Sequence, residues 1–301
     1  MGTMTLKVRS AAREVHRATC EVRVHVADRG SRASHPARRT SHHAPPRKRF
    51  GQHFLEPAWV RKVVAAIDPQ PNDTFIEIGP GRGALTRPLA DRAKQVIAHE
   101  IDRDLAAELR SSLPPNVTVI EGDFLDAPAE SRIPDPLRVA GNLPYNVATP
   151  IMFQLIDWSR RGVPIADATL MLQREVADRL LAEPGSRDYG VLTVLIRHRA
   201  SIEHLLSLPP GAFRPAPKVQ SAVVRLRFHP PDPPVEDESR FERVVKRAFS
   251  QRRKMLSNAL FGDGPGTEST PSRFPIDLRR RAETLSVAEY AQIANLLSSK
   301  T

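Results

Sequence analysis

Residues 142–145, with the sequence Asn-Leu-Pro-Tyr, carry groups that can hold a flat, amino-bearing ring such as adenine. They supply an amide, a proline-stiffened turn with free carbonyl oxygens and an aromatic face. The run follows the mostly apolar segment 137–140, which predicts a buried strand. Ligands of parallel α/β sheets bind at the carboxyl ends of such strands. An ordinary strand-to-helix turn is the alternative, because Asn and Pro are common in turns, but the surrounding motifs favour a binding site.

A glycine-rich loop joins another predicted strand to a helix. Gly79, Gly81 and Gly83 let the backbone approach a ligand closely and adopt positive φ. Their G-x-G-x-G spacing differs from the G-x-G-x-x-G of dinucleotide-binding folds, which argues against an NAD-dependent dehydrogenase. No Lys-Ser or Lys-Thr pair follows the loop, which argues against a P-loop.

Three acidic residues lie at the ends of successive predicted strands. Glu100, about 20 residues beyond the glycine loop, can accept both ribose hydroxyls of an adenosine, and Asp123 can accept from an adenine amino group. Glu77 adds negative charge that suits an ammonium and a sulfonium better than a pyrophosphate. Helix capping would explain one such acid, whereas three beside a glycine loop favour a site. The ligand that suits this set best is S-adenosylmethionine.

Strands and helices alternate through the central part of the chain. Short apolar runs predict strands at 74–78, 95–101, 117–120, 137–140 and 168–172, and helical periodicity predicts helices at 84–93, 102–109, 149–158 and 175–181. Two further strands, at 202–208 and 222–228, could close the sheet. The alternation predicts an α/β fold with a doubly wound, Rossmann-like parallel sheet.

The chain divides into three predicted parts. Residues 1–46 are rich in Arg, His, Ser and Pro and predict a disordered basic tail; a mitochondrial transit peptide or an upstream-extended start would give the same composition. Residues 47–230 form the Rossmann-like domain. After a proline-rich linker, residues 235–301 carry helical periodicity at 241–260 and 278–297, which predicts a small all-helical domain.

The overall composition indicates a soluble protein with a polyanionic partner. Hydrophobic residues make up 40% of the 301 residues and charged residues 26%, as in soluble globular proteins. The net charge of +11 predicts attraction to nucleic acid first and to an acidic membrane surface second. No run approaches the roughly 18 apolar residues of a membrane span. One cysteine, Cys20, can form neither an intrachain disulfide nor a thiolate metal cluster, which favours a reducing compartment.

Taken in order, these motifs resemble the ribosomal RNA adenine N6-dimethyltransferases. The resemblance rests on the segment 48–55 (KRFGQHFL), the glycine loop, Glu100, residues 122–123 and the Asn-Leu-Pro-Tyr run. Segments 173–179, 184–186, 189–190, 213–219 and 249–254 are similar to the KsgA/RsmA type, which modifies small-subunit RNA. The resemblance covers residues 47–297, all but the tail.

The resemblance implies a site for S-adenosylmethionine and an RNA substrate. The cofactor site would be built from His53, Leu55, Gly79, Glu100, Asp123 and Asn142. His53 stands where the family most often has Asn, and a histidine can still hydrogen-bond the methionine carboxylate. The family methylates N6 of two adjacent adenosines, twice each, in a hairpin loop near the 3′ end of 16S rRNA in the 30S subunit. A cytoplasmic monomer with a role in small-subunit biogenesis is the expectation by analogy.

Four residues would handle the target base. We expect the Asn142 side-chain oxygen and the Pro144 carbonyl to accept the N6 hydrogens and so aim the nitrogen lone pair at the methyl group. The base must leave its stack to enter the pocket. Tyr145 would stack on one face, and Phe213, in a proline-rich loop, on the other. For Phe213, a core position that pins its loop is an equally weighted alternative.

Two basic clusters predict RNA contacts. They are Arg47, Lys48 and Arg49, before the first motif, and Arg252, Arg253 and Lys254, in the helical part. Such residues contact phosphates without reading sequence, and a solvated helix face is the alternative. Two rival functions share the scaffold: an Erm-type 23S rRNA methyltransferase and a non-catalytic RNA-binding or transcription factor. Segments 173–179 and 249–254 argue against the first, and the intact Asn-Leu-Pro-Tyr motif argues against the second.

Overall fold

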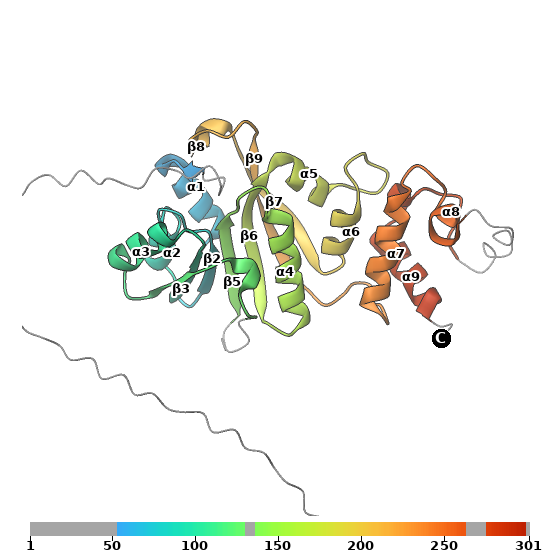
Figure 1. Ribbon diagram of the computed structural model, residues 1–301, viewed down its shortest axis with the longest axis horizontal. Helices are drawn as coiled ribbons and strands as arrows, with labels where there is room; N and C mark the ends of the chain where they lie inside the picture. The colour runs from blue at the N-terminus through green and yellow to red at the C-terminus, as the bar shows by residue number, and fades with distance from the viewer. Residues whose placement is uncertain (1–52, 130–135, 263–274, 299–301) are drawn as a thin grey trace, which may run out of the picture. The chain divides into compact units, whose positions relative to one another are not determined.

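The apolar runs of the sequence form a seven-stranded sheet in the computed structural model, which describes residues 53–129, 136–262 and 275–298 (Figure 1). The expectations for the tail 1–46, for Cys20 and for the basic cluster 47–49 lie outside the described residues. The strands are β2 (Thr74–Ile78), β3 (Gln95–Glu100), β4 (Val117–Glu121), β5 (Leu137–Asn142), β6 (Ile165–Gln173), β7 (Ala200–Leu208) and β9 (Ser221–Phe228). All seven were predicted, with ends displaced by up to three residues.

The strand order, β4-β3-β2-β5-β6-β9-β7, puts a topological switch between β2 and β5. The chain runs outward from β2 through β3 and β4, then returns to place β5 on the other side of β2. Ligands of doubly wound sheets bind at this switch, outside the carboxyl ends of the strands. Both β2 and β5 end in the segments that the sequence marked as functional.

The sheet is not wholly parallel, which corrects the prediction. β9 pairs antiparallel with β6 and with β7, whereas β2 to β6 pair in parallel. The pattern of apolar residues in a strand such as β9 does not depend on whether the strand runs parallel or antiparallel to its neighbour, so the sequence cannot show this reversal.

Helices cover both faces of the sheet, as the doubly wound prediction requires. One face packs against α4 (Ala148–Arg160) and α5 (Arg174–Leu181), through Ile76 and Val139 of the strands. The other packs against α1 (Pro57–Ile67) and α2 (Thr86–Ala90), through Phe75 and Ala140. This alternation of neighbouring strand residues between two cores follows from the period of two in a β-strand.

Several elements differ from the predicted ones. The helix expected at 84–93 is confined to the five residues of α2, while α3 (Arg103–Ser112) starts where expected. α1, α6 (Val191–Arg197) and a two-stranded antiparallel sheet of β1 (Phe54–Leu55) and β8 (Phe213–Arg214) were not predicted. A strand of two residues has no detectable periodicity.

The C-terminal part is helical, with α7 (Glu238–Ser250), α8 (Leu256–Phe261) and α9 (Val287–Ser298). The helix predicted over 241–260 is therefore two helices, separated at 251–255. The predicted helix 278–297 is α-helical only from Val287, because residues 282–284 form a 3₁₀ turn. The core of this part also contains Tyr189, Val194 and Leu195 from the segment that precedes it.

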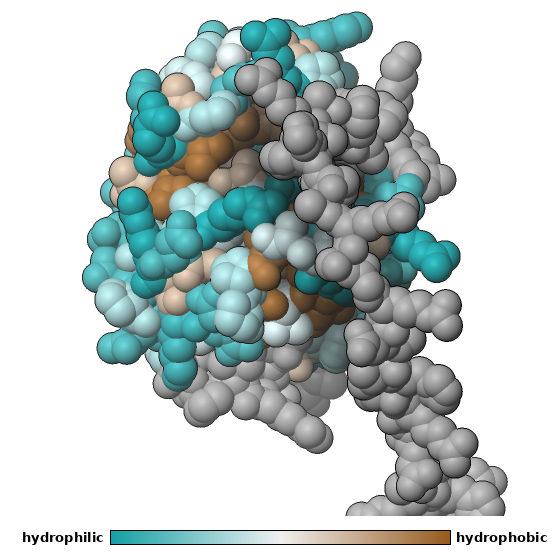
Figure 2. All heavy atoms as spheres, turned by 90° about the vertical axis from the view of Figure 1, so that its left-hand side faces the viewer, coloured by the Kyte–Doolittle hydropathy of each residue, from teal (hydrophilic) through white to brown (hydrophobic). Residues whose placement is uncertain are grey.

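The surface seen from the left of Figure 1 is mainly hydrophilic, with apolar side chains gathered in small patches between polar ones (Figure 2). Among the described residues, no helix is long and apolar enough to cross a membrane.

Candidate active site

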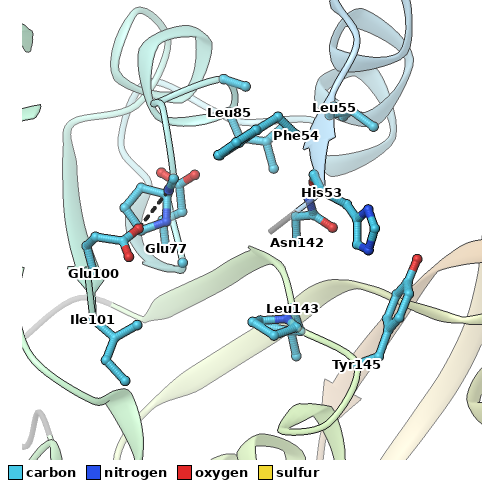
Figure 3. Close-up of a pocket in the computed structure, with 15 residues that line it drawn as sticks. His53, Phe54, Leu55, Glu77, Leu85, Glu100, Ile101, Asn142, Leu143 and Tyr145 are labelled. Carbon is cyan, nitrogen blue, oxygen red and sulfur yellow. Dashed lines mark hydrogen bonds between the residues drawn. The ribbon is translucent and has the colours of Figure 1, made fainter. Parts of the chain in front are cut away.

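A hollow opens at the carboxyl ends of β2, β3 and β5, at the switch point of the sheet (Figure 3). We call it the first hollow. Its walls come from residues 53–55, 77, 79–81, 84, 85, 100, 101 and 142–145. Five of the six residues expected to bind the cofactor, and three of the four expected to handle the base, therefore line one cavity.

A second hollow adjoins the first and contains the remaining cofactor residue. It shares Gly79, Ile101 and Pro144 with the first hollow and adds Asp123 and Phe124. The exposed Asp123 carboxylate accepts a hydrogen bond from the backbone N–H of Leu125 at 2.9 Å, as the cap of a short 3₁₀ turn. Asp123 thus does serve as a cap, and its second oxygen leaves room for the ligand contact that we expect.

The glycine loop is held close to β3 by two backbone donors. The N–H of Gly79 donates to the carbonyl of His99 at 2.9 Å. The N–H of Gly81 donates to Oε2 of Glu100 at 2.8 Å, the bond drawn as a dashed line in Figure 3. Both glycines have positive φ, 69° and 58°, which non-glycine residues adopt at a cost. A Cβ at Gly81 would also lie 3.1 Å from the Phe54 ring. The loop therefore needs glycine for its conformation and for its close packing.

Glu77 and Glu100 form an acidic wall of the first hollow. Glu100 is 4% exposed and accepts from Gly81 and, at 2.9 Å, from the backbone N–H of Asp102. Burial raises its pKa. Glu77 is 1% exposed, and its Oε2 has no hydrogen-bond partner among the described residues. Burial raises the pKa of Glu77 to about 8, against the lowering effect of Thr86 and with a further increase from Glu100.

This wall fits the cationic cofactor that the sequence predicted. A buried carboxyl without a partner is destabilised unless a donor or a cation reaches it. The ammonium and sulfonium groups of S-adenosylmethionine would supply positive charge to Glu77, and the ribose hydroxyls would supply donors to Glu100. A pyrophosphate would instead meet two carboxyl groups, which counts against a dinucleotide.

Asn142 is fixed at the end of β5 with one end of its amide already occupied. Its Nδ2 donates to the backbone carbonyl of His53 at 2.7 Å. Because a carbonyl can only accept, this bond identifies the nitrogen end and leaves Oδ1 as the free acceptor. The preceding Gly141 permits the approach of β5 to β2, since a Cβ there would lie 2.8 Å from the carbonyl oxygen of Ile78.

Tyr145 and His53 present their rings to each other at the same end of the hollow (Figure 3). The ring centroids lie 6.0 Å apart and the planes differ by 24°. The Tyr145 hydroxyl is 2.7 Å from Oγ of Ser221, and Nδ1 of His53 is 2.7 Å from the carbonyl oxygen of Pro215. Burial raises the pKa of Tyr145. Both rings are therefore held at their tips by hydrogen bonds.

Phe213 does not line the hollow, which corrects its expected role as a stacking residue. Its side chain is 1% exposed and packs in the core beneath α1. In β8 it pairs with Leu55 of β1, which is buried in the same core. The alternative that the sequence left open, a core residue that pins its loop, is the one that the structure shows.

The basic cluster 252–254 has divided roles. The Arg252 guanidinium contacts Oε2 of Glu283 at 2.5 Å and donates to the carbonyls of Ser186 and Arg187 at 3.2 and 2.7 Å. It therefore joins segments of the protein, whereas Arg253 and Lys254 are exposed. RNA binding by these two residues remains a prediction.

Sequence reasoning missed several wall residues, of which Ile101 is the most informative. This side chain is 46% exposed and borders both hollows. An exposed apolar residue directly after Glu100, the acid predicted to bind the ribose, is suited to cover the face of an adenine ring. Its position next to Glu100 was the signal in the sequence that could have identified it as a wall residue.

The fold and the site together define a class of protein. A Rossmann-like sheet with a single reversed strand, β9, ends in a glycine loop and an acidic wall beside an Asn-Leu-Pro-Tyr turn. This is a Rossmann-like, S-adenosylmethionine-dependent methyltransferase.

Comparison with known proteins narrows the class. The family model for ribosomal RNA adenine dimethylases matches residues 44–299, and the chain belongs to this family. Ribosomal RNA small subunit methyltransferase A of Aromatoleum aromaticum is 45% identical over 261 residues, which are 85% of this chain and 95% of that protein. The protein of the same name from Thiobacillus denitrificans is 46% identical, over 85% of this chain and 99% of that protein.

Solved structures show the same fold. A dimethyladenosine transferase from Plasmodium falciparum has a TM-score of 0.65 at 24% identity, covering 82% of this chain and 97% of that one. The 23S rRNA methyltransferase ErmE has a TM-score of 0.61 at 29% identity, covering 81% and 99%. The Erm-type enzyme is thus a more distant relative than the small-subunit methyltransferases.

Proposed function

We propose that this chain transfers methyl groups from S-adenosylmethionine to N6 of two adjacent adenosines in 16S rRNA, giving dimethyladenosine at both. The target is the hairpin loop near the 3′ end of that RNA, within the 30S subunit. The observation that carries the proposal is the amide of Asn142, whose nitrogen is locked by the His53 carbonyl so that Oδ1 is left as the free acceptor in a residue that lines the first hollow. The chain is 44–46% identical in sequence to the small-subunit enzymes and 29% identical to ErmE. This difference favours 16S rRNA over 23S rRNA as the substrate.

The residues of the two hollows divide the work of holding the cofactor. Glu100 would accept the ribose hydroxyls, Asp123 the adenine amino group, and Glu77 would face the ammonium. His53 and Leu55 would border the methionine end. When bound, the cofactor supplies a methyl group on a positively charged sulfur, which makes that carbon electrophilic.

Asn142 and Pro144 would orient the nucleophile. The exocyclic amine of adenine is a poor nucleophile, because its lone pair is delocalised into the ring. Accepting its two hydrogens at the Asn142 oxygen and the Pro144 carbonyl would draw the nitrogen toward a pyramidal shape. Such alignment of reacting groups can supply several kcal/mol, up to about 7–11. Tyr145 would hold the base by stacking, worth about 1–3 kcal/mol.

Proton loss does not require a strong base at this site. The nitrogen becomes acidic once it carries the new methyl group and a positive charge, so the proton can leave after transfer. Dimethylation also requires room to turn, because the first methyl group replaces one of the two N–H donors.

The cellular setting follows from the substrate. We place the protein in the cytoplasm as a monomer that binds the assembling 30S subunit and contributes to small-subunit biogenesis. The charge of +11 supports binding to a polyanion. Arg253 and Lys254 are the described residues of the predicted clusters that are exposed for phosphate contacts.

A labelling experiment tests the function directly. Purified protein would be incubated with labelled S-adenosylmethionine and with 30S or 50S subunits that lack the modification. We expect label in 30S, mapped to dimethyladenosine in the 3′ hairpin. Label confined to 50S would instead establish the Erm-type activity, and no label in either would support a non-catalytic RNA-binding protein.

A further inference from the structure

Ser221, the first residue of β9, lies at the edge of the sheet that carries the site. β9 runs antiparallel to β6, whereas β2, β5 and β6 are parallel to one another. The reversed strand therefore begins at the edge where the parallel strands end, beside the turn 142–145. This direction brings Ser221 next to Tyr145, although the two residues are 76 positions apart in the chain.

The sheet holds Ser221 from both sides. Its backbone pairs with Gln173 of β6 and with Leu208 of β7, and the residue is 1% exposed. Its Oγ lies 2.7 Å from the hydroxyl oxygen of Tyr145, an ordinary length for a hydrogen bond between two hydroxyl groups. A buried hydroxyl group is costly without such a partner. The bond thus connects Tyr145 to a fixed point of the sheet.

Tyr145 gains from this connection because it belongs to a turn. Residues 143–147 lie between the end of β5 and the start of α4 and have no regular secondary structure. The hydroxyl oxygen of a tyrosine lies on the long axis of the ring, so a bond there fixes the direction of that axis and with it χ1. A ring whose direction is set before the substrate arrives loses less freedom on binding.

We propose that Ser221 is a positioning residue for the target base: its hydroxyl group fixes the direction of the Tyr145 ring on which the adenine stacks beside Asn142. The inference rests on the proposed methylation of an adenine base. It goes beyond that function by giving a role to the reversed strand β9, none of whose residues lines either hollow. Ser221 acts only through Tyr145.

Two substitutions break the same bond from its two ends. Tyr145→Phe keeps the ring and removes its hydroxyl group, and Ser221→Ala removes the partner. If Ser221 acts through Tyr145, the double variant should be no less active than either single variant. If Ser221 serves the activity in some other way, the two effects should multiply in the double variant.

The experiment measures kcat and KM on unmethylated 30S subunits for the wild type, both single variants and the double variant. We expect each single substitution to lower kcat/KM by about 2- to 13-fold, the range that corresponds to one neutral hydrogen bond. The double variant should show the same loss. The Kd of S-adenosylmethionine, measured by calorimetry, should stay near the wild-type value in all of them.

Further variants separate positioning from folding. Ser221→Thr keeps a hydroxyl group and should retain more activity than Ser221→Ala, with melting temperature as the measure of folding. Ser201→Ala, at an exposed position of β7, should change neither activity nor cofactor affinity. NMR couplings that report χ1 at position 145 should show one rotamer in the wild type and averaging in Tyr145→Phe, so this variant tests the bond even if Ser221→Ala does not fold.

The outcomes distinguish failure of the inference from failure of the proposed function. Multiplying effects in the double variant would overturn the inference, as would full activity of Tyr145→Phe or a single χ1 rotamer at position 145 in that variant. Wild-type protein that methylated no 30S subunit would overturn the proposed function, and the positioning role with it.

Discussion

Asn142 is the residue on which the proposed chemistry depends most directly. Its amide nitrogen is used inside the protein, by the carbonyl of His53, and its oxygen is the group left to receive the substrate amine. A side chain that is pre-oriented in this way loses little freedom when the substrate arrives, which is why its position contributes to rate as well as to binding.

Asn142→Ala should abolish methyl transfer while the fold stays intact. Misplacement of a reacting group by 1 Å can cost about 100-fold in rate, and complete loss of an acceptor should cost at least as much. The test compares initial rates on 30S subunits, with melting temperature as the measure of folding. Asn72→Ala, at an exposed turn, is the matched control. A variant with the normal rate would show that Asn142 has no part in the transfer.

We expect Glu77 to make cofactor binding depend on pH. Its pKa of about 8 in the free protein means that the carboxyl is mostly protonated at neutral pH. A cationic ligand favours the carboxylate, so binding releases a proton. We expect the affinity for S-adenosylmethionine to rise with pH by up to about tenfold per unit below pH 8 and to level off above it. Calorimetry in buffers of different ionisation enthalpy would detect the released proton.

Glu77→Gln should remove this dependence, whereas Glu175→Gln, on the exposed face of α5, should not. The raised pKa also affects stability in the absence of cofactor. Between pH 4.5 and about 8 the unfolded chain releases the Glu77 proton and the folded protein retains it, so stability falls as pH rises through that range. An affinity that did not vary with pH in the wild type would show that Glu77 stays protonated beside the ligand.

Sequence predicted the polar residues of the site better than the aromatic ones. Glu100 and Asn142 were identifiable because each ends a buried strand, and parallel strands bring their carboxyl ends to one edge. Phe213 was not, since its burial depends on pairing with Leu55, 158 positions earlier.

At the scale of elements, an ionic cluster fixes the edge of the sheet opposite the site. Arg138, near the start of β5, contacts Asp73 at 2.6 Å and Asp167 of β6 at 2.9 Å. It also donates to the carbonyls of Ile67 and Asp68, at the end of α1. Burial would lower the pKa of Arg138, but the two carboxylates outweigh this effect and raise it. The cluster joins a helix end and strands β5 and β6.

Arg138→Met should destabilise the protein by about 3–5 kcal/mol, because it leaves the nearly buried Asp167 with only the longer contact to Arg225, at 3.9 Å. Arg161→Met is the comparison, since its pair with Asp157 is exposed on both sides and is worth about 0–1 kcal/mol. Denaturant unfolding measures both. If both substitutions lowered the free energy of unfolding by the same small amount, water or a neighbouring group would be replacing the contacts of Arg138.

The elements themselves were predictable where they are long and apolar. The boundaries of β2 were predicted to the residue, because a run of five buried residues is bounded by polar and glycine positions. The break between α7 and α8 was missed, since the periodicity of the two helices continues across residues 251–255. Within that interruption, Arg252 bonds to Glu283, a contact far along the chain that periodicity cannot show.

For the whole molecule, the segment 182–195 connects the sheet to the helical part. Tyr189 lies in the helical core, and the backbone N–H of Gly185 donates to the carbonyl of Glu283 at 2.7 Å. The Arg252 guanidinium bonds to the carbonyls on the same segment. The helical part is therefore packed on this segment as well as linked to the sheet by the proline-rich stretch.

Arg253→Ala should weaken binding to 30S subunits without changing cofactor affinity or melting temperature. Loss of one phosphate contact should reduce the slope of log K against log salt by about 1. Arg252→Ala should behave differently, lowering the melting temperature because Glu283 loses its partner, at a cost of about 1–3 kcal/mol. Binding assays at several salt concentrations, together with melting temperatures, distinguish the Arg253→Ala variant from the Arg252→Ala variant. An unchanged salt slope for Arg253→Ala would place the RNA contact elsewhere.

The pairing of β1 with β8 has a consequence for the newly made chain. One wall of the first hollow is formed by residues 53–55, and their strand partner lies at 213–214. While translation proceeds, the first of these segments emerges about 160 residues before the second, at synthesis rates of about 5–20 residues per second. For roughly ten seconds or more the nascent polypeptide has the glycine loop and the acids but an incomplete wall. An enzyme that modifies ribosomes would thus become competent only after most of its own translation is finished.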